Sequence, residues 1–124
     1  MIVTLTIPAP AKWLNSNDRL HWSPRAKLTK SWRQAAHVYA RQARLPKGLG
    51  RVQIDAQVHK TTGNSFDAMN LYPTLKAVVD GLVDYGLVMD DNNDHVTGPF
   101  ITDGGRRVRA EVVVTITEFG PFPK

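Results

Sequence analysis

Apolar and polar residues alternate with a period of two at residues 2–7 and 52–58, which is the pattern of a strand with one buried face. Residues 95–102 and 107–117 are predicted to form two further strands. Pro8 and Pro10 end the first stretch. We expect the last two strands to pair as a hairpin around a turn at residues 103–105, where two glycines follow an aspartate.

Two longer stretches carry apolar residues at helical spacing. The first begins with Ser23 as its cap and Pro24 in its first turn, and it runs to about Arg44. Its apolar stripe consists of Leu28, Trp32, Ala35, Ala36, Tyr39 and Ala43. The second covers roughly residues 71–85, with Pro73 in its first turn, and Gly86 ends it.

The predicted order of elements is therefore β-α-β-α-β-β. A chain of 124 residues supports one hydrophobic core and is short for two. We predict a single small α+β domain over residues 1–124, with a mixed sheet, two helices packed on one face of it, and a frayed tail at residues 120–124.

Charge is distributed unevenly along the chain. The formal net charge is +5, but residues 1–60 hold eleven Lys or Arg and two acids, whereas residues 61–124 hold five basic residues and nine acids. A basic region suits a polyanion, and a concentration of carboxylates suits a metal ion. Charge alone leaves nucleic-acid binding and simple solubility equally open.

Composition excludes several classes of chemistry. The chain has no cysteine, so disulfides, thiolate nucleophiles and cysteine-held zinc are excluded. No stretch reaches the roughly 20 apolar residues of a membrane span, and no basic leader precedes the apolar start. We therefore expect a cytoplasmic protein without a membrane partner, in which oxygen or imidazole must hold any metal.

Three aspartates flank the second predicted helix and are candidates for a metal site. Asp67 lies just before the helix, and Asp90 and Asp91 lie just after it. Magnesium prefers oxygen ligands, and carboxylates from different elements can hold it if the fold brings the two helix ends together. The structural alternative is that Asp67 belongs to the helix cap and residues 90–94 form a solvated turn.

Lys76 lies within the same helix, and two roles are open to it. The lysine could contact a phosphate or stabilise the leaving group in phosphodiester hydrolysis. Asp80 follows four residues later, so a surface ion pair accounts for Lys76 equally well.

A polar loop and the basic face of the first helix are candidate contacts for nucleic acid. The residues are Asn15, Asn17 and Arg19 in the loop, and Arg25, Lys27 and Lys30 on the helix. Trp13 and Trp22 flank the loop, where they either stack on unpaired bases, pack in the core or form a dimer contact.

Several ordered groups of residues resemble the RusA family of Holliday junction resolvases. They are DAMNL at residues 67–71, KAVVDGL at 76–82 and GLVMDD at 86–91, with the polar loop at 15–19 and the closing runs at 105–106 and 114–118. The family pattern has Asp-x-Asp-Asn-Leu, a lysine four residues before an aspartate, and a hydrophobic stretch that ends in Asp-Asp. The resemblance spans nearly the whole chain.

This resemblance implies a metal-dependent endonuclease that resolves four-way DNA junctions in recombination and repair, acting as a homodimer. It assigns metal binding to Asp67, Asp90 and Asp91, and catalysis to Asp67, Lys76 and Asp91. Asn70 either orients a ligand or caps the helix. Mg2+ is the expected cofactor, with Mn2+ as a substitute. A bacterial, phage or prophage source fits the family.

One position departs from the family pattern. Met69 stands where the family has its second aspartate, and about three residues, 72–74, are inserted before the lysine. A thioether is a poor ligand for magnesium and cannot replace a carboxylate. Either another acid joins the site, with Asp94 the first candidate and Asp80 the second, or the protein binds branched DNA without cutting it well. A general nuclease with no preference for junctions is a third possibility.

Overall fold

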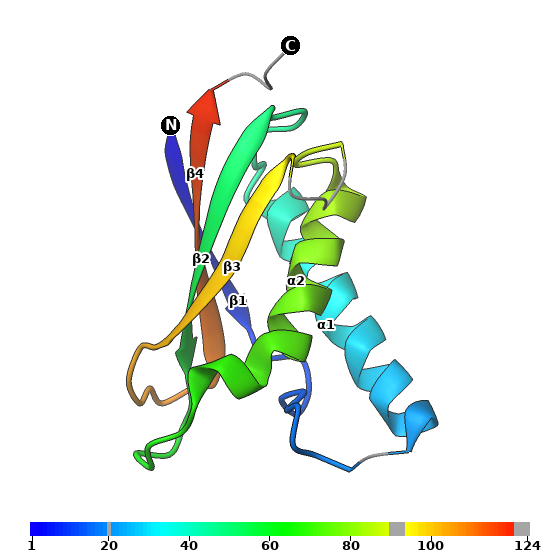
Figure 1. Ribbon diagram of the computed structural model, residues 1–124, viewed down its shortest axis with the longest axis vertical. Coiled ribbons are helices and arrows are strands. Elements are labelled where there is room, and N and C mark those ends of the chain that lie inside the picture. Colours follow the sequence, from blue (N-terminus) through cyan, green and yellow to red (C-terminus); the bar gives the residue numbers. More distant parts are fainter. Residues whose placement is uncertain (20, 90–93, 121–124) are drawn as a thin grey trace.

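Two helices lie on one face of a four-stranded sheet (Figure 1). The computed structural model describes residues 1–19, 21–89 and 94–120. The strands are β1 (Ile2–Pro8), β2 (Arg51–His59), β3 (Val96–Asp103) and β4 (Glu111–Gly120). The helices are α1 (Trp22–Gln42) and α2 (Tyr72–Tyr85), and a short 3-10 helix, η1 (Ala68–Leu71), directly precedes α2. The predicted α+β class and element order are confirmed, and the predicted frayed tail lies outside the described residues from residue 121 onward.

The strand order in the sheet is β1-β4-β2-β3. β4 pairs antiparallel with both β1 and β2, whereas β3 runs parallel to β2, so the sheet is mixed as predicted. A parallel pair needs a crossover connection, and η1 and α2 supply it between β2 and β3. This crossover places η1 at the carboxyl end of β2 and returns the chain to the start of β3.

The predicted hairpin of the last two strands is wrong, because β2 lies between β3 and β4. The turn itself forms, since Asp103 Oδ1 accepts a hydrogen bond from Gly105 N–H at 2.9 Å. The chain then crosses the end of β2, where Gly104 N–H donates to the Val58 carbonyl at 2.9 Å. The local turn signal is correct, but both edges of the apolar strand β2 need partners, and β3 and β4 each pair with one edge.

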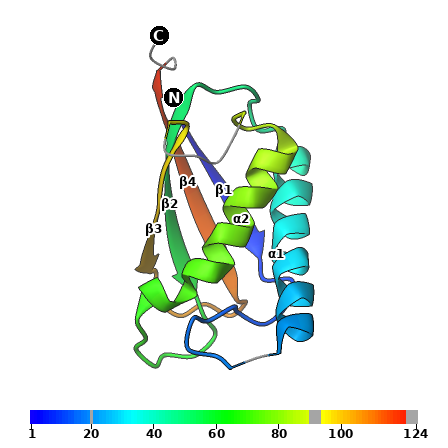
Figure 2. The same cartoon turned by 45° about the vertical axis from the view of Figure 1, so that its right-hand side comes forward.

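The face of the sheet toward the helices is apolar, and the opposite face is open to solvent (Figure 2). Alternate residues of β2 are fully buried, namely Val52, Ile54, Ala56 and Val58. The residues between them are polar, and threonines of β1 and β4 continue the polar face. The period of two in the sequence is thus the division between the core and the open face.

α1 begins two residues earlier than predicted and lacks the predicted cap. His21 is the N-cap residue and makes no side-chain cap hydrogen bond, while Ser23 lies inside the first turn. The fully buried residues of the helix are Trp32, Ala36 and Ala40. The predicted apolar stripe packs on the core except at its end, where Ala43 lies beyond the helix and is exposed.

α2 packs against α1 at close range around Gly81. A Cβ at this position would lie 2.2 Å from the Arg33 carbonyl oxygen, so a side chain here would push the two helices apart. Arg33 also donates two hydrogen bonds across the helix pair to Asp84, at 2.6 and 2.8 Å. Gly86 ends α2 in the left-handed region, with φ 102°, which confirms the predicted helix end.

The sheet has two contrasting ends. The polar end, defined as residues 9–19, 60–71 and 104–110, lies at the carboxyl ends of β2 and β3 (Figure 1). The apolar end, defined as residues 45–50 and 86–88, lies at the start of β2. There Gly48 N–H donates to the Gly86 carbonyl and Leu49 N–H donates to the Leu87 carbonyl, each at 2.8 Å.

Candidate functional site

Asp67 shapes a tight turn at the polar end. It is the N-cap residue of η1, and its Oδ1 accepts a hydrogen bond from the Met69 backbone N–H at 3.0 Å. Its carbonyl accepts a second bond from the Asn70 N–H, also at 3.0 Å. The capping role considered from the sequence is therefore real. The side chain is exposed, so capping through one oxygen is compatible with a metal contact through the other.

The polar loop is fastened directly to this turn. The backbone N–H and the hydroxyl of Ser16 both donate to the Asn70 carbonyl, at 2.7 and 3.1 Å. Nearby, the Thr74 hydroxyl accepts from the Leu14 N–H and donates to the Leu14 carbonyl, both at 2.8 Å. These side-chain bonds join positions that are 54 and 60 residues apart, and they hold the loop against η1 and the start of α2.

Two of the predicted groups therefore meet at one end of the molecule. Asn15 Oδ1 accepts a hydrogen bond from the Asn17 N–H at 2.8 Å, so Asn15 shapes the loop, while Asn17 and Arg19 are exposed beside it. Asn70 links the loop to the Asp67 turn through its backbone carbonyl. A role for the Asn70 side chain in orienting a metal ligand stays a prediction.

Lys76 forms the intrahelical ion pair that the sequence left open. Its Nζ lies 2.9 Å from Asp80 Oδ1, four residues further along α2. Asp80 is therefore engaged by a cation, which weakens it as a substitute metal ligand. A phosphate contact by Lys76 stays a prediction.

The described residues on either side of positions 90–93 lie at the other end of the sheet. Asp90 and Asp91 lie outside the described residues. Asp94 is exposed, and the next residue, His95, accepts a hydrogen bond through its carbonyl from the Val52 N–H at 2.8 Å, at the start of β2. Asp94 and Asp67 thus lie at opposite ends of β2, and the structure does not bring these two predicted ligands together within one chain.

The described residues at the polar end do not form a cluster of three acidic side chains. Among residues 1–19, 21–89 and 94–120, no group of three or more His, Asp or Glu side chains is placed to hold a metal ion. Met69 stands at the position where the family has an aspartate, and it is 56% exposed. Its backbone N–H donates a hydrogen bond to the Asp67 side chain. An acid at position 69 would therefore lie beside Asp67 on the surface.

The basic residues predicted on α1 flank an exposed tryptophan. Trp22 is 83% exposed and lines a hollow of about 550 Å³ with Arg25, Ala26, Thr29, Lys30 and Arg33. Lys27 is exposed on the same helix. Trp13 instead stacks on Trp32, with ring centroids 5.0 Å apart. Core packing is thus correct for Trp13 and wrong for Trp22, whose role in stacking or in a dimer stays a prediction.

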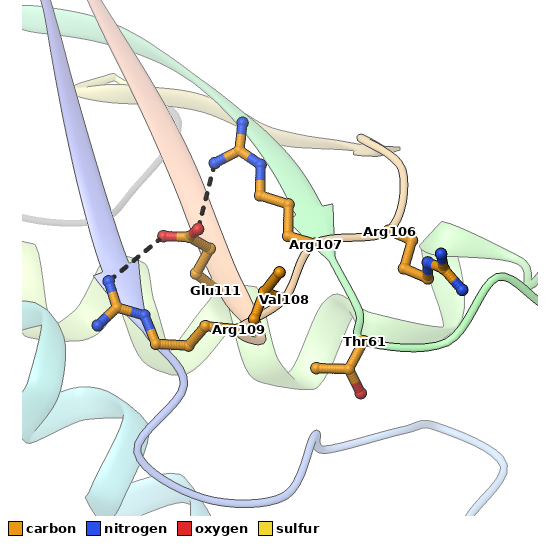
Figure 3. A pocket seen from close by; sticks show the side chains of 6 residues that line it. All are labelled: Thr61, Arg106, Arg107, Val108, Arg109 and Glu111. Carbon is orange, nitrogen blue, oxygen red and sulfur yellow. Dashed lines mark hydrogen bonds and ion pairs between the residues drawn. The ribbon is translucent and has the colours of Figure 1, made fainter.

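A second basic cluster was not predicted from the sequence. Residues 104–110 carry three arginines in four positions, and they line a hollow of about 760 Å³ at the polar end (Figure 3). The lining residues are Thr61, Arg106, Arg107, Val108, Arg109 and Glu111. Three arginines so close in sequence indicate a basic cluster. The cluster was not recognised because residues 103–105 were interpreted as a hairpin turn leading directly into a strand.

Fold and site together define a small single-domain α+β protein whose polar, charged loops gather at one end of the sheet. No family model matches the chain. It is 36% identical over 119 residues to an uncharacterized protein of Xylella fastidiosa, and the match covers 92% of this chain and 75% of that protein. The chain therefore belongs to the same family as the Xylella protein. Within the described part of the chain, no helix has the length and apolar character needed to span a bilayer.

Proposed function

We propose that this protein is a Mg2+-dependent endonuclease that resolves four-way DNA junctions as a homodimer in the bacterial cytoplasm. The observation that carries the proposal is the Ser16–Asn70 contact. It places the loop predicted to contact DNA against the turn of Asp67, the predicted metal ligand that begins the family-like motif. Residues far apart in the sequence, and assigned to one reaction by the resemblance, lie together in the fold.

The oxygen donors of Asp67, Asp90 and Asp91 fit the ligand preferences of Mg2+ or Mn2+. When bound, the metal would supply an activated water and neutralise charge on the scissile phosphate. Lys76 would contact that phosphate in place of Asp80. The Lys76–Asp80 ion pair is partly exposed and therefore weak. Arg19, Arg25, Lys27 and Lys30 would hold the DNA backbones.

We further propose that each site joins Asp67 of one chain to Asp91 of a second chain. β2 separates the two ends of the sheet, and its nine residues cover roughly 26 Å. His95, four residues after Asp91 in the sequence, bonds to Val52 at the start of β2, whereas Asp67 lies beyond the end of β2. In a two-fold dimer, Asp67 of one chain can meet Asp91 of the other, and the symmetry creates two such sites. Two such sites would cut symmetry-related strands of a four-way junction, and this is the functional reason for a homodimer.

The experiment is cleavage of a labelled synthetic four-way junction beside a linear duplex of the same sequence, with Mg2+ and with chelator. Paired nicks in the junction alone, abolished by chelator, are the expected result. Asp91→Asn should abolish the nicks and leave junction binding nearly unchanged, since it removes a ligand and not a DNA contact. Cutting by this variant at the wild-type rate would overturn the site. Equal cutting of the duplex would instead identify a general nuclease.

Met69 supports a second candidate, a branched-DNA-binding protein that has lost catalysis. Its side chain is exposed beside Asp67 and offers a magnesium ion no oxygen. Met69→Asp distinguishes the two candidates, because the new carboxylate lies on the same turn. A large gain in cutting over an inactive wild type favours the binding protein. A wild type that already cuts, with little gain from the substitution, favours the endonuclease.

A further inference from the structure

The arginine loop, residues 104–110, carries three positive charges and contains no acid of its own. Arg107 lies 3.3 Å and Arg109 3.9 Å from the carboxylate of Glu111, and this single acid serves both arginines. The side chain of Glu111 is only 12% exposed, whereas those of Arg107 and Arg109 are 45% and 68% exposed. Arg106 points away from Glu111 on the other side of the hollow (Figure 3). Three guanidinium groups thus face solvent, and the mostly buried carboxylate of Glu111 pairs with two of them.

The backbone of this loop is held at its start and in its middle. At its start, Gly104 N–H donates to Val58, and a Cβ on Gly104 would lie 2.4 Å from the His59 ring. The ring Nδ1 of His59 lies 3.0 Å from the Gly105 carbonyl oxygen. In its middle, Arg107 N–H donates to the Lys60 carbonyl at 2.9 Å. The arginines therefore project from a held backbone, which reduces the entropy lost when they bind a ligand.

The shape of the cluster selects among anions. A free small anion needs several donors converging on one buried point, whereas these guanidinium groups are spread along the rim of an open hollow of about 760 Å³. A chain of phosphates matches such a row, because each phosphate needs only one or two donors and successive phosphates are evenly spaced. Thr61 adds a hydroxyl to the same rim.

We propose that Arg106, Arg107 and Arg109 form a nucleic-acid backbone site that binds consecutive phosphates of one strand. The site lies at the polar end, as do Asp67 and the loop at residues 15–19. The choice of nucleic acid as ligand rests on the proposed function, but binding by this loop requires neither metal nor cutting. The loop extends the DNA-binding surface from α1 across the carboxyl ends of β2 and β3.

The test measures binding of a labelled duplex and a labelled four-way junction in chelator, over a range of salt concentrations. Arg106→Ala and Arg109→Ala should each weaken binding roughly five- to tenfold at low salt. Each should also lower the slope of log affinity against log salt by about 0.9 for duplex DNA, because one phosphate contact is lost. Arg41→Ala is the matched control, since it removes the same charge from the far end of α1.

The result that overturns the proposal is a wild-type affinity and salt slope in both loop variants, with thermal unfolding showing that they are folded. Equal losses in Arg41→Ala also overturn it, because net charge would then explain the effect. A wild type that binds neither DNA in chelator overturns nucleic acid as the ligand. If the wild-type protein never cuts but the loop variants bind DNA more weakly than it does, the proposed function is contradicted and the arginine site is supported.

Discussion

The polar and apolar ends of the sheet are closed by different interactions. At the apolar end, backbone hydrogen bonds join residues 48–49 to 86–87, and Leu45, Leu49, Leu87 and Val88 are buried. At the polar end, the Ser16 side chain bonds to the Asn70 backbone, Thr74 in the first turn of α2 bonds to the Leu14 backbone, and Asp67 and the arginines remain exposed. The apolar end therefore stabilises the fold, whereas the polar end exposes charged side chains to solvent. Substituting buried residues at the apolar end should therefore change mainly stability, and substituting exposed residues at the polar end should change mainly function.

The largest expected effect is on catalysis and comes from the polar end. Asp67→Asn should reduce junction cutting by at least about 100-fold, because an amide is a weaker metal ligand than a carboxylate. Asparagine caps helices as well as aspartate does, so the free energy of unfolding should stay within about 0.5 kcal/mol of wild type. Junction cleavage and urea unfolding measure the two quantities. A variant that loses stability and cutting together would remove the contrast between the ends.

The apolar end should respond in the opposite way. Leu87→Ala removes a fully buried side chain and should lower the free energy of unfolding by about 2–4 kcal/mol, measured by urea unfolding. The folded protein should still bind a four-way junction with wild-type affinity. Met89→Ala is the control in the same segment, because Met89 is exposed and its loss should change stability little. Weakened junction binding by the folded Leu87 variant would show that the apolar end also contacts DNA.

Thr74→Val tests the connection between the loop and α2. The hydroxyl makes two buried bonds with Leu14, and valine leaves both backbone groups unpaired at nearly constant volume. We expect a loss of about 1–3 kcal/mol in unfolding free energy. Junction affinity should fall as well, because the loop at residues 15–19 is released. Thr97→Val on the exposed face of β3 is the control. An equal loss of stability and junction affinity in this control would show that the Thr74–Leu14 bonds are not the cause.

The smallest effect concerns the ion pair between the helices. The hydrogen bond from Arg33 holds the pKa of Asp84 below its usual value, against the opposing effect of partial burial. Because the folded state binds this proton less readily, the contribution is present above the unfolded pKa of about 4 and is lost as pH falls through the lowered folded value. It amounts to about 0.5–1 kcal/mol for a partly exposed pair. Asp84→Asn should flatten this part of the stability curve between pH 5 and pH 2, measured by urea unfolding, and an unchanged slope would contradict the assignment.

The elements could be predicted because their signals are local. Alternation defines the buried face of β2, and Pro73 and Gly86 mark the ends of α2. Strand order could not be predicted in the same way, because the turn at Asp103 is compatible with a hairpin and with a crossing over β2. The choice depends on which strand completes the edges of β2, and that is a property of the whole sheet.

The candidate site was only partly visible in the sequence. Asp67 and the polar loop were identified separately, but their contact depends on the Ser16 and Asn70 pairing, which no local pattern encodes. The ion pair of Lys76 with Asp80 follows from helical spacing and was considered. The arginine loop was missed because its role appears only when the chain crosses β2 and Glu111 is buried beneath it.

The measurement that tests the central claim most directly uses a supercoiled plasmid that extrudes a cruciform, a four-way junction in a closed circle. Wild-type protein with Mg2+ should linearise it, because a dimer with two sites cuts both strands. Asp67→Asn and Asp91→Asn should each be inactive alone. Co-refolded as a mixture, they should yield nicked circles, since each mixed dimer keeps one intact site made from two chains. Linearisation by wild type without nicking by the mixture would contradict a site shared between chains, and an uncut plasmid with wild type would contradict the endonuclease itself.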